Sequence, residues 1–106
     1  MRVIPLDATP NQVVTARLGG VRFEIRLRDI GGMMAADITR ADEPVLRGVR
    51  AVAGTPLIPY RYLEAGAGNL IFLSSEDNPF LIPYWPNFGT RTRLIYASEE
   101  ELRAAA

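Results

Sequence analysis

The sequence contains no cysteine and no histidine among its 106 residues. Without cysteine the chain has neither disulfides nor thiolate metal sites, so packing alone must hold the fold together. Without histidine it also lacks the commonest general base and the commonest metal ligand, and the Cys–His and Ser–His nucleophile arrangements are excluded. The sequence therefore predicts no enzyme, and we assign no catalytic residue, no metal ligand and no cofactor.

Lysine is absent too, and the twelve basic residues are all arginine. They balance twelve acidic residues, so the formal net charge is zero and no overall field draws the protein to nucleic acid or to an anionic membrane. No signal segment and no apolar run near the ~18 residues of a membrane span is visible. Arginine suits protein contacts, although a GC-rich genome that favours Arg codons is the simpler explanation.

The chain does contain many short strand patterns separated by Gly and Pro turns. Gln12–Leu18 and Val21–Leu27 flank Gly19-Gly20, a pair that tolerates the positive φ angles of a two-residue hairpin turn. Such a turn places three apolar pairs on one face: Leu18 with Val21, Ala16 with Phe23, and Val14 with Ile25. The other face pairs Arg17 with Arg22, Thr15 with Glu24, and Val13 with Arg26, so all its residues but Val13 are charged or polar.

A second glycine pair, Gly31-Gly32, reverses the chain into Met33–Arg40. A two-residue turn there predicts the pairs Ile25 with Ile38, Leu27 with Ala36, and Arg26 with Asp37. A four-residue loop would keep the same faces but bring Glu24 opposite Asp37, so like-charge repulsion favours the tighter turn. The exposed Arg26–Asp37 pair would then contribute about 0.2–1 kcal/mol.

Further strands are predicted at Arg2–Leu6, Val45–Ala53, Asn69–Ser75 and Arg93–Ala97. Gly48 is expected to mark a bulge, and Pro59 makes Leu57–Leu63 an edge or extended segment in which Tyr60 and Tyr62 share one face. Because Asn69–Ser75 is apolar on both sides, we expect both its faces to be covered.

With roughly seven short strands and no long helical period, the sequence predicts one all-β domain over residues 1–106. Its expected architecture is an antiparallel β-sandwich or small barrel. Ser98 and Glu101 have the spacing of a capping box, which predicts a short helical or frayed tail over residues 98–106.

The loop between the last two strands carries three prolines, four aromatic residues and almost no charge. A rigid aromatic segment of this kind is typical of a protein interface or a carbohydrate-stacking platform, and it also fits a loop folded back over its own core. The neighbouring Glu76-Asp77-Asn78 lacks the spacing of a calcium loop and is interpreted as an acidic turn. We predict these residues as a protein-interaction site: Pro79, Phe80, Tyr84, Trp85, Phe88 and Arg91.

Between about residue 3 and residue 97 the chain resembles the baseplate plug proteins of contractile-tailed bacteriophages. The resemblance lies in an ordered series of phrases: Ile4-Pro5-Leu6, Pro10-Asn11-Gln12, Gly19-Gly20, Asp37, Pro44, Gly54-Thr55-Pro56-Leu57, Gly68-Asn69-Leu70-Ile71-Phe72 and Gly89-Thr90-Arg91-Thr92-Arg93-Leu94-Ile95-Tyr96. The family commonly has a short acidic Asp-Pro turn where this chain has Asn78-Pro79 and an apolar extension.

The resemblance implies a structural, non-catalytic subunit of the phage tail baseplate. It would be made in the host cytoplasm, become part of the virion, and be present in several copies with other tail proteins. It implies a place beside the hub and spike, where a plug helps to assemble and close the tail tube. The alternative is a small carbohydrate-binding β module that uses Tyr84, Trp85 and Phe88 as its stacking platform.

Overall fold

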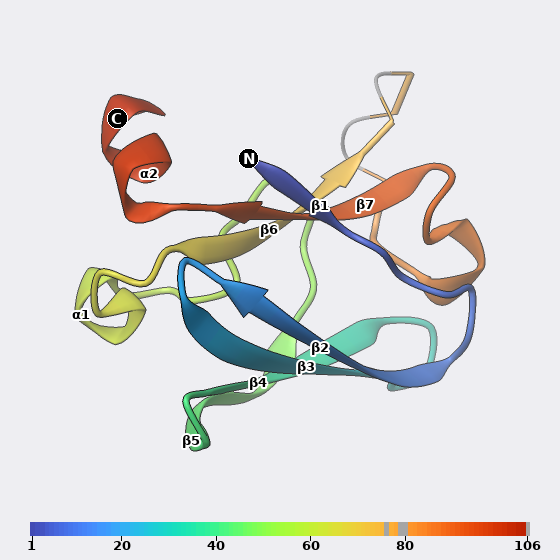
Figure 1. Ribbon diagram of the computed structural model, residues 1–106. Helices are drawn as coiled ribbons and strands as arrows, with labels where there is room; N and C mark the ends of the chain where they lie inside the picture. Colours follow the sequence, from blue (N-terminus) through green and yellow to red (C-terminus); the bar gives the residue numbers. More distant parts are fainter. Residues whose placement is uncertain (76, 79–80, 106) are drawn as a thin grey trace.

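The fold is given by a computed structural model, which describes residues 1–75, 77–78 and 81–105. Within these residues the chain forms seven strands in two antiparallel sheets that lie face to face (Figure 1). The all-β prediction is confirmed. Of its two architectures the open sandwich is the correct one, because neither sheet closes into a barrel over the described residues.

The smaller sheet has the order β1-β7-β6, formed by Arg2–Ile4, Thr92–Ala97 and Asn69–Ser74. The larger sheet has the order β2-β3-β4-β5, formed by Asn11–Leu18, Val21–Asp29, Met34–Arg40 and Glu43–Arg50. The helical elements are short: α1 (Arg61–Glu64), the 3-10 turn η1 (Trp85–Asn87) and α2 (Glu99–Ala105). No helix of the described chain is long and apolar enough to span a bilayer.

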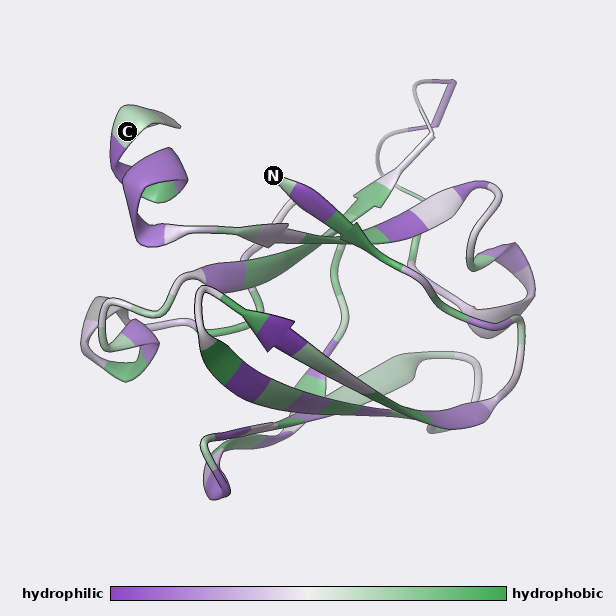
Figure 2. Cartoon of the chain, viewed as in Figure 1, coloured by the Kyte–Doolittle hydropathy of each residue, from purple (hydrophilic) through white to green (hydrophobic). Residues whose placement is uncertain are grey.

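Both predicted hairpins are confirmed in their register. Gly19 and Gly20 adopt positive φ angles of 59° and 79°, and the β2–β3 ladder has Leu18 opposite Val21. The β3–β4 ladder sets Ile25 opposite Ile38, as the two-residue turn at Gly31-Gly32 requires. Apolar and polar residues therefore alternate along β3, which Figure 2 shows as green and purple stripes.

The core lies between the sheets and is built by these alternating positions. The four-stranded sheet contributes Phe23, Ile25, Leu27 and Ile38, and the three-stranded sheet contributes Ile4, Leu70, Phe72 and Leu94. Each of these side chains is at most 1% exposed. A cysteine-free chain thus obtains its stability from one continuous apolar layer.

The predicted Arg26–Asp37 ion pair is wrong, although the two residues do lie opposite each other. The Asp37 carboxylate instead pairs with the diagonal neighbour Arg28, at 3.2 Å. The same carboxylate oxygen, Oδ1, accepts a hydrogen bond from the Gly48 N–H at 2.6 Å. We attribute the choice of partner to this second bond, because it fixes the orientation of the carboxylate.

Gly48 does form the predicted bulge. The ladder passes from Ala36 opposite Val49 to Ile38 opposite Leu46, so two residues of β5 face the single Asp37. Gly48 has a φ of +66°, which suits glycine at this position of a bulge. The strand itself ends at Arg50, three residues earlier than predicted.

The extended conformation predicted for Leu57–Leu63 is wrong in its second half. Leu57 does run along β6, where its N–H donates to the carbonyl of Leu70 at 2.8 Å. After Pro59 the chain turns into α1, because the carbonyl of Tyr60 accepts from the N–H groups of Leu63 and Glu64. The rings of Tyr60 and Tyr62 stack at 5.6 Å on the surface.

The expectation that both faces of Asn69–Ser75 are covered is also wrong. Leu70 and Phe72 face the core and are fully buried, whereas Leu73 on the other face is 45% exposed. The described chain has only two layers, the two sheets. The helix α2 does not form a third layer over Leu73, because it lies beyond one end of the three-stranded sheet (Figure 1).

The tail forms α2, which begins with two reciprocal hydrogen bonds. The Ser98 hydroxyl accepts from the N–H of Glu101 at 3.2 Å, and the Glu101 carboxylate accepts from the N–H of Ser98 at 3.1 Å. This is the reciprocal capping box that the sequence indicated. The amino group of Met1 also contacts Glu101, so α2 is fastened to the start of β1.

Candidate protein-interaction loop

The described part of the loop, residues 81–91, is ordered by its own backbone hydrogen bonds. The Phe88 N–H donates to the carbonyl of Trp85 at 3.2 Å and thereby closes η1, with Pro86 inside its first turn. The carbonyl of Asn87 then accepts from the N–H groups of Thr90 and Arg91 at 3.2 and 3.0 Å. Two of the predicted site residues, Pro79 and Phe80, lie outside the described residues.

Phe88 belongs to the core. Its side chain is 3% exposed, and its ring stacks on Phe72 of β6 with centroids 5.8 Å apart and an interplanar angle of 18°. The rings of Tyr84 and Trp85 are inclined by 51° to each other. These three residues therefore do not form the single flat stacking platform that the carbohydrate-binding alternative calls for.

Tyr84 ties the loop to the far end of the other sheet. Its hydroxyl donates to Asp29 Oδ2 at 2.7 Å, at the tip of the β3–β4 hairpin, and Asp29 Oδ1 accepts from the Gly32 N–H at 3.1 Å. The Tyr84 hydroxyl and the Gly32 N–H lower the pKa of Asp29, and the carboxylate in turn raises the pKa of Tyr84. The contact joins two residues that are 55 positions apart in the sequence.

We expect the Tyr84–Asp29 contact to be lost in acid. The pKa of Asp29 is lowered below its ordinary 3.8, so this carboxylate stabilises the fold above that pH and ceases to do so as the pH falls through the folded-state value.

The fluorescence of Trp85 measures this loss, because Trp85 is the only tryptophan and lies beside Tyr84. Its fluorescence should change below pH 3.8 in the native chain, whereas in Asp29→Asn the signal should already be altered at neutral pH and should not titrate. A full acid transition in Asp29→Asn would show that another group is responsible; Asp7→Asn is the matched control.

Trp85 and Arg91 form the outer side of the loop together with Ile82. Trp85 is half-buried against the core, while the side chain of Ile82 is 49% exposed. Arg91 pairs with Asp77 at 3.4 Å across a surface where both side chains are exposed. The carboxylate of Asp77 thus already has Arg91 as its counter-ion. No cluster of potential metal ligands occurs among the described residues.

The comparison with known families decides between the two functions that the sequence left open, a baseplate plug and a carbohydrate-binding module. The model of the family described as "Cyanophage baseplate Pam3 plug gp18" matches residues 1–99 of the chain. The chain belongs to this family. The match spans all seven described strands and the loop, and it ends at the first residue of α2. No curated protein matches the chain.

As a member of the plug family the protein is a structural component of the phage baseplate, and therefore of the virion, and is not an enzyme. The predicted resemblance is confirmed. Baseplate membership also implies assembly with other baseplate proteins. The interaction site stays a prediction, and one of its members, Phe88, lies in the core; the six residues are Pro79, Phe80, Tyr84, Trp85, Phe88 and Arg91.

One residue important for the loop of this plug-family protein was not singled out from the sequence. Asp29 fixes Tyr84, but it reads as an ordinary turn residue before Gly31-Gly32. Asp with Gly in a hairpin indicates only a local turn. The long-range contact depends on how the two sheets are stacked, which no local pattern contains.

Proposed function

We propose that this plug-family protein sits at the centre of the baseplate against the hub and spike, where it helps to assemble and close the tail tube. Its loop would be one of the contact surfaces, and several copies would act together in the assembly. The observation that supports a contact role is that the loop is braced at two points, by Phe88 in the core and by Tyr84 on Asp29.

A braced loop suits binding for an energetic reason. A segment that is already held in place loses little conformational entropy when a partner covers it. Around these two anchors the loop presents Ile82 before Tyr84, part of Trp85 between the anchors, and the exposed Arg91 after Phe88. Tryptophan and arginine are the side chains most often found to dominate interface energies, because they bury large areas and make directed polar contacts.

Trp85→Ala is expected to weaken binding to the hub or spike protein of the same phage by about 2–4 kcal/mol. Its effect on the melting temperature of the free protein should be smaller, since Trp85 is only half-buried there. Titration calorimetry with the purified partner and differential scanning calorimetry of the free chain give the two values. Tyr62→Ala is the matched control, because Tyr62 is a 75% exposed aromatic residue on another part of the surface.

The ranking of the two effects decides the outcome. A large loss of binding with a small loss of stability supports the loop as a contact surface. A large fall in melting temperature with unchanged binding would show that Trp85 serves only the core, and would remove the loop from the proposed interface.

A further inference from the structure

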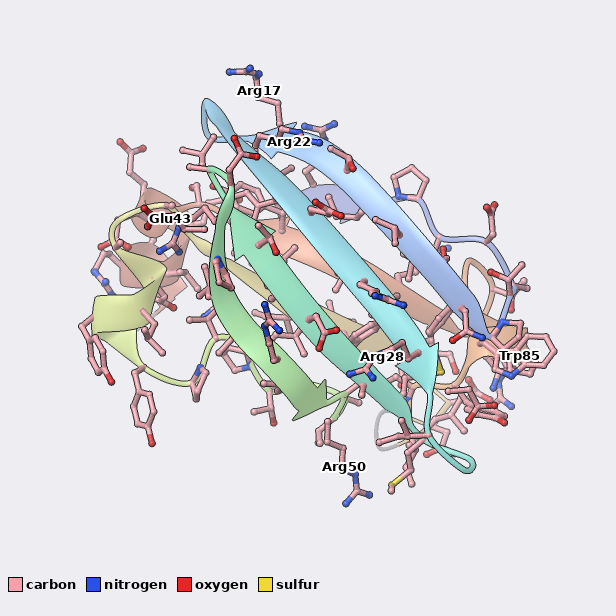
Figure 3. All side chains as sticks on the ribbon, turned by 90° about the horizontal axis from the view of Figure 1, so that it is seen from below. Arg17, Arg22, Arg28, Glu43, Arg50 and Trp85 are labelled. Carbon is pink, nitrogen blue, oxygen red and sulfur yellow. The ribbon has the colours of Figure 1, made fainter. Side chains whose placement is uncertain are left out.

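Half of the twelve arginines gather on the outer face of the four-stranded sheet. Figure 3 looks onto this face and shows Arg17, Arg22, Arg28 and Arg50 spread from one end to the other. We call this surface the arginine face; its members are Arg17, Arg22, Arg26, Arg28, Arg47 and Arg50. A net charge of zero conceals this concentration, because it says nothing of where the charges lie.

The bulge at Gly48 places two of these arginines on the same face. Arg47 and Arg50 are three positions apart and would point to opposite faces in a regular strand. Because the bulge inserts one extra residue opposite Asp37, the alternation shifts between them. Arg50 then lies opposite Ala35, which pairs with Arg28, while Arg47 borders the same outer hollow as Glu24 and Arg26.

Two of the carboxylates near these arginines are already engaged within the chain, whereas Glu24, which borders the same hollow as Arg26 and Arg47, forms no ion pair within 4.0 Å among the described residues. Asp37 holds Arg28 and the bulge, and Asp42 pairs with Arg22 at 3.0 Å. Among the described residues Arg26, Arg47 and Arg50 have no ion-pair partner within 4.0 Å. Arg26 and Arg47 border a hollow of about 210 Å³, whose other walls are Glu24, Asp37, Thr39 and Leu46.

We propose that the arginine face binds an acidic surface of another baseplate protein, and that Arg26, Arg47 and Arg50 receive its carboxylates. The guanidinium group offers a planar pair of donors that matches a carboxylate, and this makes arginine suited to ion pairs at interfaces. The proposal goes beyond the loop contact of the proposed function. Of the protein's role it assumes only membership of the baseplate, so it does not depend on whether the loop binds a partner.

Charge also argues against two other occupants of the arginine face. Nucleic acid is disfavoured because Glu24 and Asp37 interrupt, in the middle of the face, the continuous positive surface that an evenly charged phosphate backbone would follow, whereas a protein can place separate carboxylates beside the arginines. A second copy would have to supply acidic residues, and the densest cluster, in α2, is largely engaged: Glu99 pairs with Arg103 at 2.6 Å and Glu101 contacts the amino terminus. A carboxylate-bearing surface of a different protein is the better complement.

The test uses phage lacking this gene and supplied with variants in trans. The double variant Arg47→Glu/Arg50→Glu reverses the free end of the arginine face, and Arg2→Glu/Arg93→Glu makes the same charge change at exposed residues of the other sheet. We expect plug copies per purified particle, counted by mass spectrometry, to fall about tenfold in the first variant and less than about twofold in the control. Unchanged melting temperatures would show that both variants fold.

Equal incorporation of both variants, or an equal loss in both, would overturn the inference. A second arm identifies the partner: Thr15→Cys, on the same face, gives the cysteine-free chain one attachment point for a photo-cross-linker. Cross-linking within particles to an Asp- or Glu-rich peptide of another baseplate protein supports the inference. Cross-linking to DNA, to a second copy or to nothing overturns it. The loop contact is tested by a different variant, Trp85→Ala, so its failure can be distinguished from failure of this inference.

Discussion

Asn69→Ala is expected to lower the free energy of unfolding by about 3–4 kcal/mol, because it removes a fully satisfied buried amide. Asn69 is 0% exposed at the start of β6. Its Oδ1 accepts from the N–H groups of Ile58 and Leu70 at 3.0 and 2.8 Å, and its Nδ2 donates to the Ile58 carbonyl at 2.9 Å and to the carboxylate of Glu64. One side chain thus joins β6, the segment before α1 and α1 itself.

The size of this effect follows from what the substitution leaves behind. Alanine cannot replace either polar atom, so the buried N–H and carbonyl of Ile58 would lose their partner, and the carboxylate of the 8% exposed Glu64 would keep, among the described residues, only Arg103, at 3.9 Å. Urea denaturation followed by circular dichroism gives the free energy of unfolding. Asn11→Ala, at an exposed position, is the control and should change it by less than about 0.5 kcal/mol. A similarly small change for Asn69→Ala would contradict the hydrogen-bond network described here.

Phe88→Ala should lower the free energy of unfolding by about 3–5 kcal/mol, the usual range for removing a buried phenylalanine ring. The ring stacks on Phe72 and is 3% exposed, so its loss leaves a cavity beneath the loop. The same denaturation experiment measures the effect. Phe88→Leu keeps most of the volume and should cost less than about 1.5 kcal/mol.

The Phe88 and Trp85 variants together distinguish the two roles of the loop, which are stabilising the fold and binding a partner. If Phe88→Ala left stability unchanged and abolished assembly, Phe88 would be an interface residue, as the sequence suggested. The structure instead predicts a division between them. Phe88 should control stability, and Trp85 should control binding.

The sequence predicted best where one turn fixes many pairs. Gly19-Gly20 and Gly31-Gly32 set the register of three strands, because a two-residue turn determines every pair beyond it. The amphipathic alternation of β3 agrees with the same register. Local chemistry and global packing point to one answer there.

The sequence predicted least where contacts cross between segments. The bulge at Gly48 was expected, but without its position in the ladder the faces of Arg47 and Arg50 were undetermined. The Tyr84–Asp29 contact and the α1 helix after Pro59 likewise depend on tertiary packing. For that reason the aromatic loop was recognised as unusual from its composition, whereas its anchors and the arginine face emerged only from the fold.

The central claim, that this protein is a structural part of the phage baseplate, is tested most directly by the protein content of purified particles of the encoding phage. Mass spectrometry of intact virions and of baseplates isolated from them should find the chain at one fixed ratio to the other baseplate proteins. Absence of the chain from purified virions, with the other baseplate proteins present, would contradict the claim.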